Sequence, residues 1–170
     1  DVAMEMIDLA DADKPTSIRT FGEPTTYYAQ VVIGSTLYRS TQQTVEAWDI
    51  TDPNTPVQKN VWSGDDYADI LAIAGDEDRL LLSKRGTGPI DGTITIVEID
   101  GTDATVRGSY TTVDHNHKAV LKGDHLYIIS IDGDPWSDET GPWGLDIVSI
   151  ANPGSPNRVA RIEGSLRDII

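Results

Sequence analysis

The sequence contains no cysteine among its 170 residues. This absence excludes disulfide bridges, a thiol nucleophile, and zinc or iron–sulfur sites built on cysteine. It leaves the compartment open, because both cytosolic and extracellular proteins can lack cysteine.

Basic residues are also scarce. There are 13 Lys and Arg against 28 Asp and Glu, which gives a net charge of -15. Proteins that bind nucleic acids depend on Lys and Arg to neutralise phosphates, so no nucleic-acid partner is expected. A protein with this negative net charge is favoured to stay soluble and attracts cations or basic partners. Asp outnumbers Glu 21 to 7 and there are only 5 Lys, a balance typical of proteins in high salt; a calcium-loaded surface is the alternative.

Long apolar runs are missing as well. No stretch approaches the roughly 18 residues that a membrane-spanning helix needs, so no transmembrane segment is predicted. The opening segment, DVAMEMIDLA, lacks the basic region and cleavage site of a signal peptide. Because the first residue is Asp rather than Met, we expect the chain to be a mature or excised piece of a longer protein, with any export signal upstream.

The strongest positive signal is an internal repeat. One column of four residues follows apolar runs at successive offsets of 41, 49 and 51: Asp8, Asp49, Glu98 and Ser149. A second column, three of whose members stand six residues before a glycine, has offsets of 41, 48 and 51: Tyr28, Asp69, His117 and Asp168. Because the spacings in two independent columns change by nearly the same amounts, the sequence predicts four repeated units.

Each unit predicts four short strands rich in Val, Ile, Tyr and Thr. The predicted strands are 27–33, 37–41, 45–50 and 56–62 in one unit, 67–74, 79–84, 93–99 and 105–110 in the next, and 117–122, 125–130, 145–150 and 158–163 in the third. Between the third and fourth strands, Asp52 to Pro56 and Asn152 to Pro156 form an Asp/Asn-Pro-x-x-Pro pattern. Its Asp or Asn side chain is expected to cap the turn and its proline to preset the backbone.

Four strands in 40 to 50 residues is the period of a β-propeller blade, so we predict a single all-β domain of antiparallel, four-stranded blades. The blade pieces are 1–22, 27–62, 67–110, 115–163 and 165–170. The chain opens on a third and a fourth strand and stops inside a first strand. This favours three complete blades plus parts of another, in an arc of a larger propeller. A closed ring of four with one three-stranded blade is the alternative.

Several phrases resemble a known repeat. GDHLYIIS, GLDIVSIANPGSP and the closing LRDII are similar to the LVIVD repeat, a propeller blade type of secreted or surface proteins of bacteria and archaea. The fit is good at 48–56 and 145–156, but 96–105 lacks both prolines. The resemblance implies a propeller outside the cell or on its surface, and it implies a scaffold rather than a chemistry.

Antiparallel order predicts that the second-to-third loops and the inter-blade connections share one face. That loop spans Gln42 to Thr44 in the first complete unit, but Arg85 to Gly92 and Ile131 to Trp143 in the next two. Long loops on a rigid scaffold often carry binding residues. We therefore predict contacts with a protein or glycan partner here, through four residues: Trp136, Trp143, Arg85 and Asp138. Packing of the tryptophans on the blade below is the alternative.

The longest loop also concentrates carboxylates, which suit Ca²⁺. The candidate ligands are Asp132, Asp134 and Glu139; the alternative is a solvated acidic loop, because the sequence does not complete a known calcium-loop pattern. No other cofactor is predicted.

The second column predicts a further site at the mouth of the central channel, where Tyr28, Asp69, His117 and Asp168 would begin the innermost strands. His115 and His117 stand two apart, a spacing that places both on one face of a regular strand. Together with Asp69 they could hold a divalent metal. A hydrated channel lining is the alternative.

Catalytic patterns are absent: the sequence has no G-x-S-x-G elbow, no glycine-rich phosphate loop and no H-E-x-x-H helix. The favoured interpretation is a non-enzymatic module that mediates protein, glycan or assembly contacts through its long-loop face, with self-assembly through open blade edges among them. The alternative is a metal-dependent enzyme or metalloprotein that uses the channel mouth.

Overall fold

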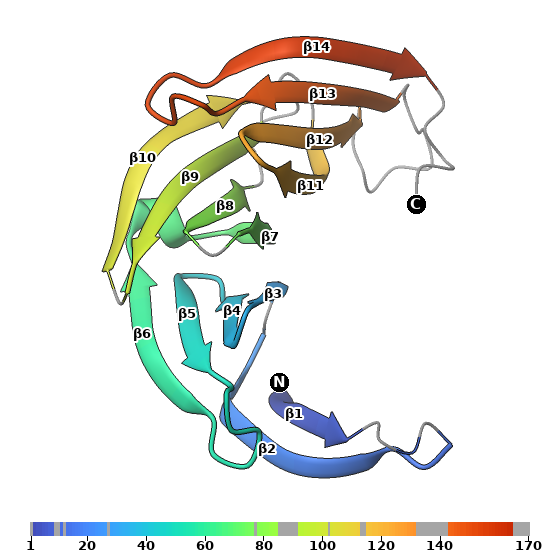
Figure 1. Ribbon diagram of the computed structural model, residues 1–170, viewed down its shortest axis with the longest axis vertical. Helices are drawn as coiled ribbons and strands as arrows, with labels where there is room; N and C mark the ends of the chain where they lie inside the picture. Colours follow the sequence, from blue (N-terminus) through green and yellow to red (C-terminus); the bar gives the residue numbers. More distant parts are fainter. Residues whose placement is uncertain are drawn as a thin grey trace.

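A computed structural model describes residues 2–8, 11, 13–26, 28–76, 78–84, 92–101, 103–112, 115–131 and 143–164. The described residues form three four-stranded sheets and one two-stranded sheet, all antiparallel. Figure 1 shows the four sheets side by side in an arc, each with its first strand toward the concave side. The chain is thus an all-β protein of propeller blades, three complete and one partial.

The strands follow one another within each sheet. The N-terminal pair consists of β1 (Val2–Asp8) and β2 (Thr16–Thr25). Blade 1 consists of β3 (Ala29–Ile33), β4 (Thr36–Ser40), β5 (Thr44–Asp49) and β6 (Val57–Ser63). Blade 2 consists of β7 (Ile70–Gly75), β8 (Arg79–Lys84), β9 (Thr93–Asp100) and β10 (Asp103–Thr111). Blade 3 consists of β11 (His115–Lys122), β12 (His125–Ile131), β13 (Trp143–Ser149) and β14 (Asn157–Gly164).

The core lies between blades rather than within them. Strand residues alternate between the two faces of a sheet, so blade 2 buries one apolar set against blade 1 and another against blade 3. One cluster joins blades 1 and 2 and includes Tyr38, Val45, Leu80 and Leu82. A second cluster joins blades 2 and 3 and includes Leu81, Ile94, Leu126 and Ile128. This sheet-on-sheet burial holds the arc together.

The proline-containing turn has the predicted structure in blade 1. The backbone N–H of Asn54 donates to Oδ1 of Asp52 at 2.9 Å, and Oγ1 of Thr55 donates to Oδ2 at 2.7 Å. These bonds, that of Thr55 first, lower the pKa of Asp52 below its ordinary value because they stabilise the carboxylate. In blade 3 the backbone N–H of Ser155 donates to the carbonyl of Asn152 at 2.9 Å, as Thr55 does to Asp52 at 3.0 Å.

One predicted strand start is wrong. Tyr67 belongs to a single 3₁₀ turn, η1 (Asp65–Tyr67), and the strand begins only at Ile70. The Tyr67 N–H donates to the carbonyl of Gly64, and its ring stacks on Trp62 with centroids 6.3 Å apart. The turn therefore packs the ring of Tyr67 against the outer strand of blade 1. An extended backbone at Tyr67 would move this ring away from Trp62.

The repeat is also less regular than the second column suggests. Gly34 and Gly123 are the first residues of two-residue hairpin turns, with φ of 57° and 56°. Gly75 instead pairs with Leu80 inside the β7–β8 hairpin. The glycines that align in the sequence thus occupy different positions, because blade 2 reverses two residues later.

Candidate functional site

The loops are arranged on two faces as predicted, at the points that the structure describes. The backbone N–H of Asp69, in the connection between blades 1 and 2, donates to the carbonyl of Gln42 in the second-to-third loop of blade 1 at 3.0 Å. At the end of blade 2, the N–H and Oγ1 of Thr112 both donate to the carbonyl of Gly92, just before β9. Inter-blade connections and second-to-third loops thus share one face, which we call the long-loop face.

Most of the predicted binding residues on this face lie outside the described residues. They are Arg85, Asp132, Asp134, Trp136, Asp138 and Glu139. The strands that carry the longest loop are described: Ile131 ends β12, Trp143 begins β13, and the two pair with each other. The loop of blade 1 is Thr41 to Gln43, because Thr44 already belongs to β5 and pairs with Ser63.

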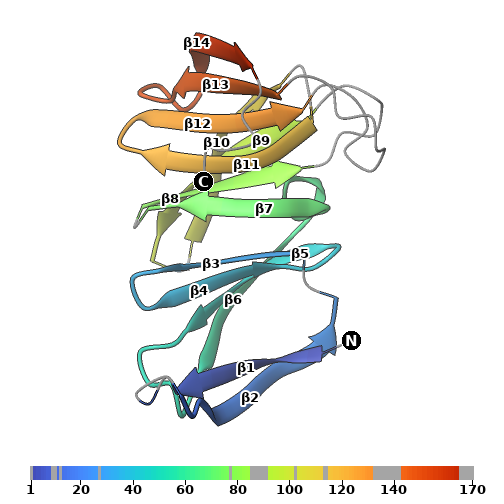
Figure 2. The ribbon, with the colours of Figure 1, turned by 90° about the vertical axis from the view of Figure 1, so that its right-hand side faces the viewer.

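Of the predicted channel-mouth residues, Tyr28 and Asp69 precede the first strands of blades 1 and 2 and His117 lies within β11, but Tyr28 and Asp69 are not equivalent. Figure 2 looks onto the inner strands and shows β3, β7 and β11 stacked along the arc. Tyr28 immediately precedes β3 and its N–H donates to Ser40 of the same blade, whereas Asp69 bonds to the preceding blade. Asp69 has φ of 54°. Asp168 lies outside the described residues.

The spacing argument for His115 and His117 fails at a β-bulge. In the β11–β12 ladder, Asn116 pairs with Ser130 and Lys118 with Ile129, so His117 is the extra residue. A bulge interrupts the alternation of faces. Two-residue spacing alone therefore does not fix the faces of the two histidines, and the metal site with Asp69 stays a prediction. Within the described residues no group of three or more His, Asp and Glu could hold a metal ion.

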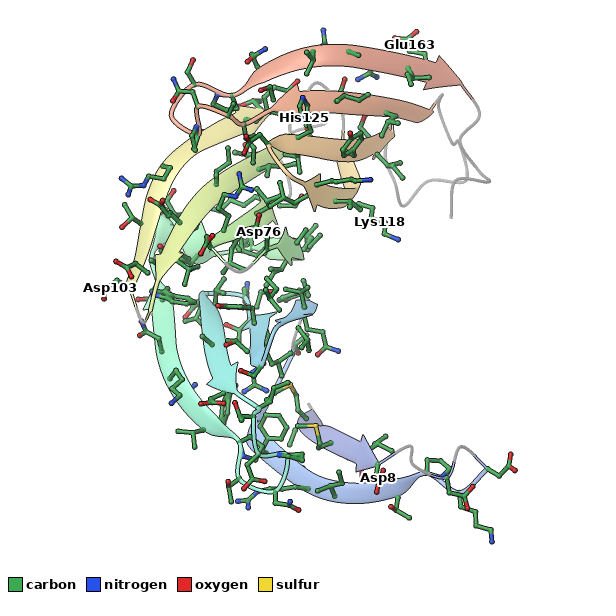
Figure 3. All side chains as sticks on the ribbon, viewed as in Figure 1. Asp8, Asp76, Asp103, Lys118, His125 and Glu163 are labelled. Carbon is green, nitrogen blue, oxygen red and sulfur yellow. The ribbon has the colours of Figure 1, made fainter. Side chains whose placement is uncertain are left out.

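The opposite face, which carries the hairpin turns, holds ion pairs that the sequence did not reveal. Arg79 donates to the Asp76 carboxylate of its own blade at 2.6 Å, and to Oδ1 of Asp124 and the carbonyl of Gly123 in blade 3 at 3.1 and 3.0 Å. Figure 3 labels Asp76 in blade 2. Burial would raise the pKa of Asp76, but the hydrogen bonds and positive charge of Arg79 outweigh it and hold that pKa below its ordinary value. Arg79 therefore ties blade 2 to blade 3.

The third and fourth strands share a repeated bulge. Lys59, Arg107 and Val159 are the extra residues in β6, β10 and β14. Lys59 pairs with Asp49 at 3.1 Å, and Arg107 pairs with Glu98. The acidic partners belong to the first column of the repeat, so these ion pairs explain two of its four members. Hydrogen bonds from Thr51, followed by those from Lys59, lower the pKa of Asp49 to about 2.

Next to these ion pairs, the turn between the third and fourth strands of each blade, here called the outer turn, approaches the preceding sheet. Arg79, Glu98 and Arg107 line a cavity of about 400 Å³ together with Asn152 to Gly154, in the last outer turn. Gly108 lies so close to this turn that an added Cβ would stand 2.1 Å from the carbonyl oxygen of Pro153. The described cavities on this face are therefore gaps between blades, whose walls are ion-paired.

The chain matches known proteins in structure and not in sequence. No protein-family model matches the chain, and no curated protein matches it. Among solved structures it is similar to the crystal structure of the N-terminal domain of Nup159, with a TM-score of 0.55 and 10% sequence identity over 92% of this chain and 42% of that one. The fold is a β-propeller. The same values describe its similarity to the S. cerevisiae complex of a Dbp5 variant bound to Nup159, Gle1, IP6 and ADP.

These similarities show the propeller fold alone, since only one residue in ten is identical. The chain spans 42% of the length of each matched chain. Within the described residues, the structure contains no helix with the length and apolar character that a membrane crossing requires.

Proposed function

We propose that the chain is a non-enzymatic propeller module that binds a protein partner through its long-loop face. The observation that carries this proposal is the sidedness of the scaffold. The Asp69 to Gln42 bond and the Thr112 to Gly92 bonds place the connections of blades 1 and 2 beside the second-to-third loops. Loops that leave neighbouring blades on one face can together contact a single partner.

The residue types in the two long loops support a protein partner. Trp136 and Trp143 are of a residue type enriched at the centres of protein interfaces, and Arg85 is of the type that pairs with carboxylates through a planar group. The opposite face favours binding less, because Arg79 and Arg107 are already paired with acids there. An extracellular or cell-surface location is part of the proposal and rests on the resemblance to LVIVD repeats.

Two binding screens with the purified chain test the site, one on a displayed peptide library and one on a glycan array. Replacement of residues 132–142 by a Gly-Ser linker should abolish binding of the selected peptide ligand while the far-ultraviolet spectrum is unchanged. Trp136→Ala and Asp138→Asn should weaken it, whereas Asp103→Asn, on the outer edge of blade 2, should not. Unchanged binding by the loop replacement would refute the site, and selection of glycans alone would replace the protein partner by a sugar.

The proposed Ca²⁺ ligands Asp132, Asp134 and Glu139 are tested separately. If Ca²⁺ binds these residues, chelation at fixed salt should lower the melting temperature and weaken ligand binding together. A melting temperature that rises with molar salt but ignores chelator supports salt adaptation instead.

A further inference from the structure

A cavity lies at each junction between neighbouring sheets. The cavity between the N-terminal pair and blade 1 is lined mainly by apolar residues, among them Met4, Met6 and Val32. The cavity between blades 2 and 3 is the one lined by Arg79 and Arg107. The third cavity lies between blades 1 and 2, has a volume of about 260 Å³ and is lined mainly by hydrogen-bonding side chains. Because all four strands of both blades are present, its walls do not depend on how the chain continues.

The same repeat positions surround the two cavities that lie between complete blades. In each, the third strand contributes an acid and the bulge of the fourth strand contributes a base: Asp49 and Lys59 in one, Glu98 and Arg107 in the other. Each acid is paired with its base. Asp49 and Lys59 are the only charged residues among those described that line the cavity between blades 1 and 2. This cavity therefore carries no net charge, which favours an uncharged ligand.

A small residue makes the floor of this cavity hollow. Ala47 lies between Tyr38 and Asn60 in one rung of the blade 1 sheet, and both neighbours line the cavity with it. Blade 2 has Ile96 at the position of Ala47. The methyl group of Ala47 thus leaves room between a phenol and an amide, which can each donate and accept hydrogen bonds.

Two aromatic side chains also belong to the wall. The ring of Trp62 is stacked on that of Tyr38 and on that of Tyr67, with centroids 6.3 Å apart in both cases. Trp62 and Tyr38 line the cavity, and the stacking fixes their orientation before any ligand binds. A sugar ring has an apolar face of C–H groups and a rim of hydroxyls. It therefore matches a cavity that joins aromatic carbon to polar side chains.

The ion pair at the rim offers both an acceptor and a donor. The pKa of Asp49 lies near 2, so at neutral pH its carboxylate only accepts hydrogen bonds. The ammonium group of Lys59 carries three N–H donors, meets Asp49 at 3.1 Å and belongs to a side chain that is 49% exposed. A hydroxyl can donate to Asp49 or accept from Lys59 while this pair stays closed. A charged ligand would instead compete with one partner for the other.

The volume sets the size of the ligand. About 260 Å³ lies below the roughly 300–1,000 Å³ of pockets for drug-sized molecules, so the cavity fits one small ring. We propose that the cavity between blades 1 and 2 binds a neutral monosaccharide. Asp49 and Lys59 bind its hydroxyls, Asn60 binds a further one, and its C–H face packs on Tyr38 and Trp62. The site is independent of the long-loop face, so either proposal can fail without the other.

The test titrates the purified, ¹⁵N-labelled chain with a fixed panel of neutral sugars: the methyl glycosides of glucose, galactose, mannose, fucose and N-acetylglucosamine. At least one should bind saturably, with a Kd of about 1 mM, as expected for so small a ligand. Binding should shift the amide signals of Ala47, Lys59, Asn60 and Gly101, which surround the cavity. L-Alanine and glucuronate, which are charged, should bind more weakly than the best neutral sugar.

Matched variants separate the site from general effects of charge and folding. Lys59→Ala should weaken binding of that sugar about three- to tenfold, because it removes a donor. Arg107→Ala makes the corresponding change at the bulge of blade 2 and should leave binding unchanged. Ala47→Ile should abolish binding by filling the hollow with the residue of blade 2. Because Ala47 is buried, Asn60→Ala serves as a second variant outside the apolar core and should also weaken binding.

Three results would overturn the proposal: no saturable binding of any sugar in the panel, binding that Lys59→Ala and Asn60→Ala both leave unchanged, or tighter binding of L-alanine or glucuronate than of every neutral sugar. Equal weakening by Arg107→Ala and Lys59→Ala would also overturn it, since the effect would then follow from charge alone. Shifts confined to Thr41–Thr44 and Trp143, on the long-loop face, would place the sugar elsewhere and contradict the assignment.

Discussion

The junctions between complete blades and the junction between the N-terminal pair and blade 1 use one repeat position in opposite ways. Leu82 and Ile128 occupy this position in blades 2 and 3, where both are fully buried among apolar residues. Blade 1 has Arg39 there, paired with Glu46 and lying 4.9 Å from the ring centroid of Trp48. Aliphatic contact thus joins complete blades, whereas a charge neutralised within its own blade faces the incomplete one.

Removing an aliphatic contact between complete blades should have the largest effect. Ile128→Ala leaves a cavity in the cluster between blades 2 and 3, which should lower the free energy of unfolding by about 2–5 kcal/mol. Val120→Ala, in the neighbouring strand at a half-exposed position, should cost under about 0.5 kcal/mol. Urea denaturation of both variants measures the difference, and equal losses would show that this cluster does not join the blades.

Two substitutions can convert the ion pair of Arg39 and Glu46 to the uncharged residues that blade 2 has at these positions. Glu46→Thr removes the carboxylate that pairs with the buried guanidinium of Arg39 at 2.6 Å and should cost about 2–3 kcal/mol, because that pairing offsets the burial of the charge. The double variant Arg39→Leu, Glu46→Thr carries the residues that blade 2 has as Leu82 and Thr95. It should recover all but about 1 kcal/mol of the loss in urea denaturation. A double variant no more stable than Glu46→Thr would mean that the incomplete neighbour requires Arg39 itself.

Close approach of the outer turns should give a smaller effect. Gly108→Ala forces the new Cβ against the carbonyl of Pro153, so the free energy of unfolding should fall by about 1–3 kcal/mol. Gly154→Ala, on the facing turn, meets its nearest neighbour at an ordinary 3.5 Å and serves as the control. Thermal unfolding of the two variants compares them, and identical melting temperatures would contradict the tight contact between blades 2 and 3.

The smallest effect concerns pH at the outer turn of blade 1. The pKa of Asp49 lies near 2, below the value of about 4 that an unfolded chain would have. Its contribution to stability is therefore present above about pH 4 and is lost as the pH falls toward 2. Asp49→Asn should flatten the fall in melting temperature across this interval. The pH profile of Asp103→Asn should match that of the unsubstituted chain, and a profile of Asp49→Asn that also matched it would remove Asp49 from this role.

The sequence predicted the strands, their order and the proline-containing turns, because each depends on local patterns such as alternation or the Asp52 to Pro56 motif. It did not predict the bulges at His117 or Lys59, because an extra residue in a ladder is a matter of pairing between strands and leaves the residue pattern unchanged. Nor did it reveal that Arg39 is buried, because an arginine in a strand is usually solvated. The bond of Arg79 to Asp124 joins residues of different blades, which periodicity alone cannot pair.

The candidate sites were less predictable than the fold. The repeat correctly indicated which loops share a face, but the residues proposed for binding lie in the two longest loops, outside the described residues. The cavity lined by Met4, Met6 and Val32 left no motif, because its walls come from two different sheets.

Amide hydrogen exchange tests most directly the claim that the core lies between complete blades. The amides of Leu80–Leu82 and Leu126–Ile128, in strands buried between blades, should exchange much more slowly than those of Asn157–Gly164, in the largely exposed outer strand of blade 3. Equal rates of exchange in these strands would contradict the account.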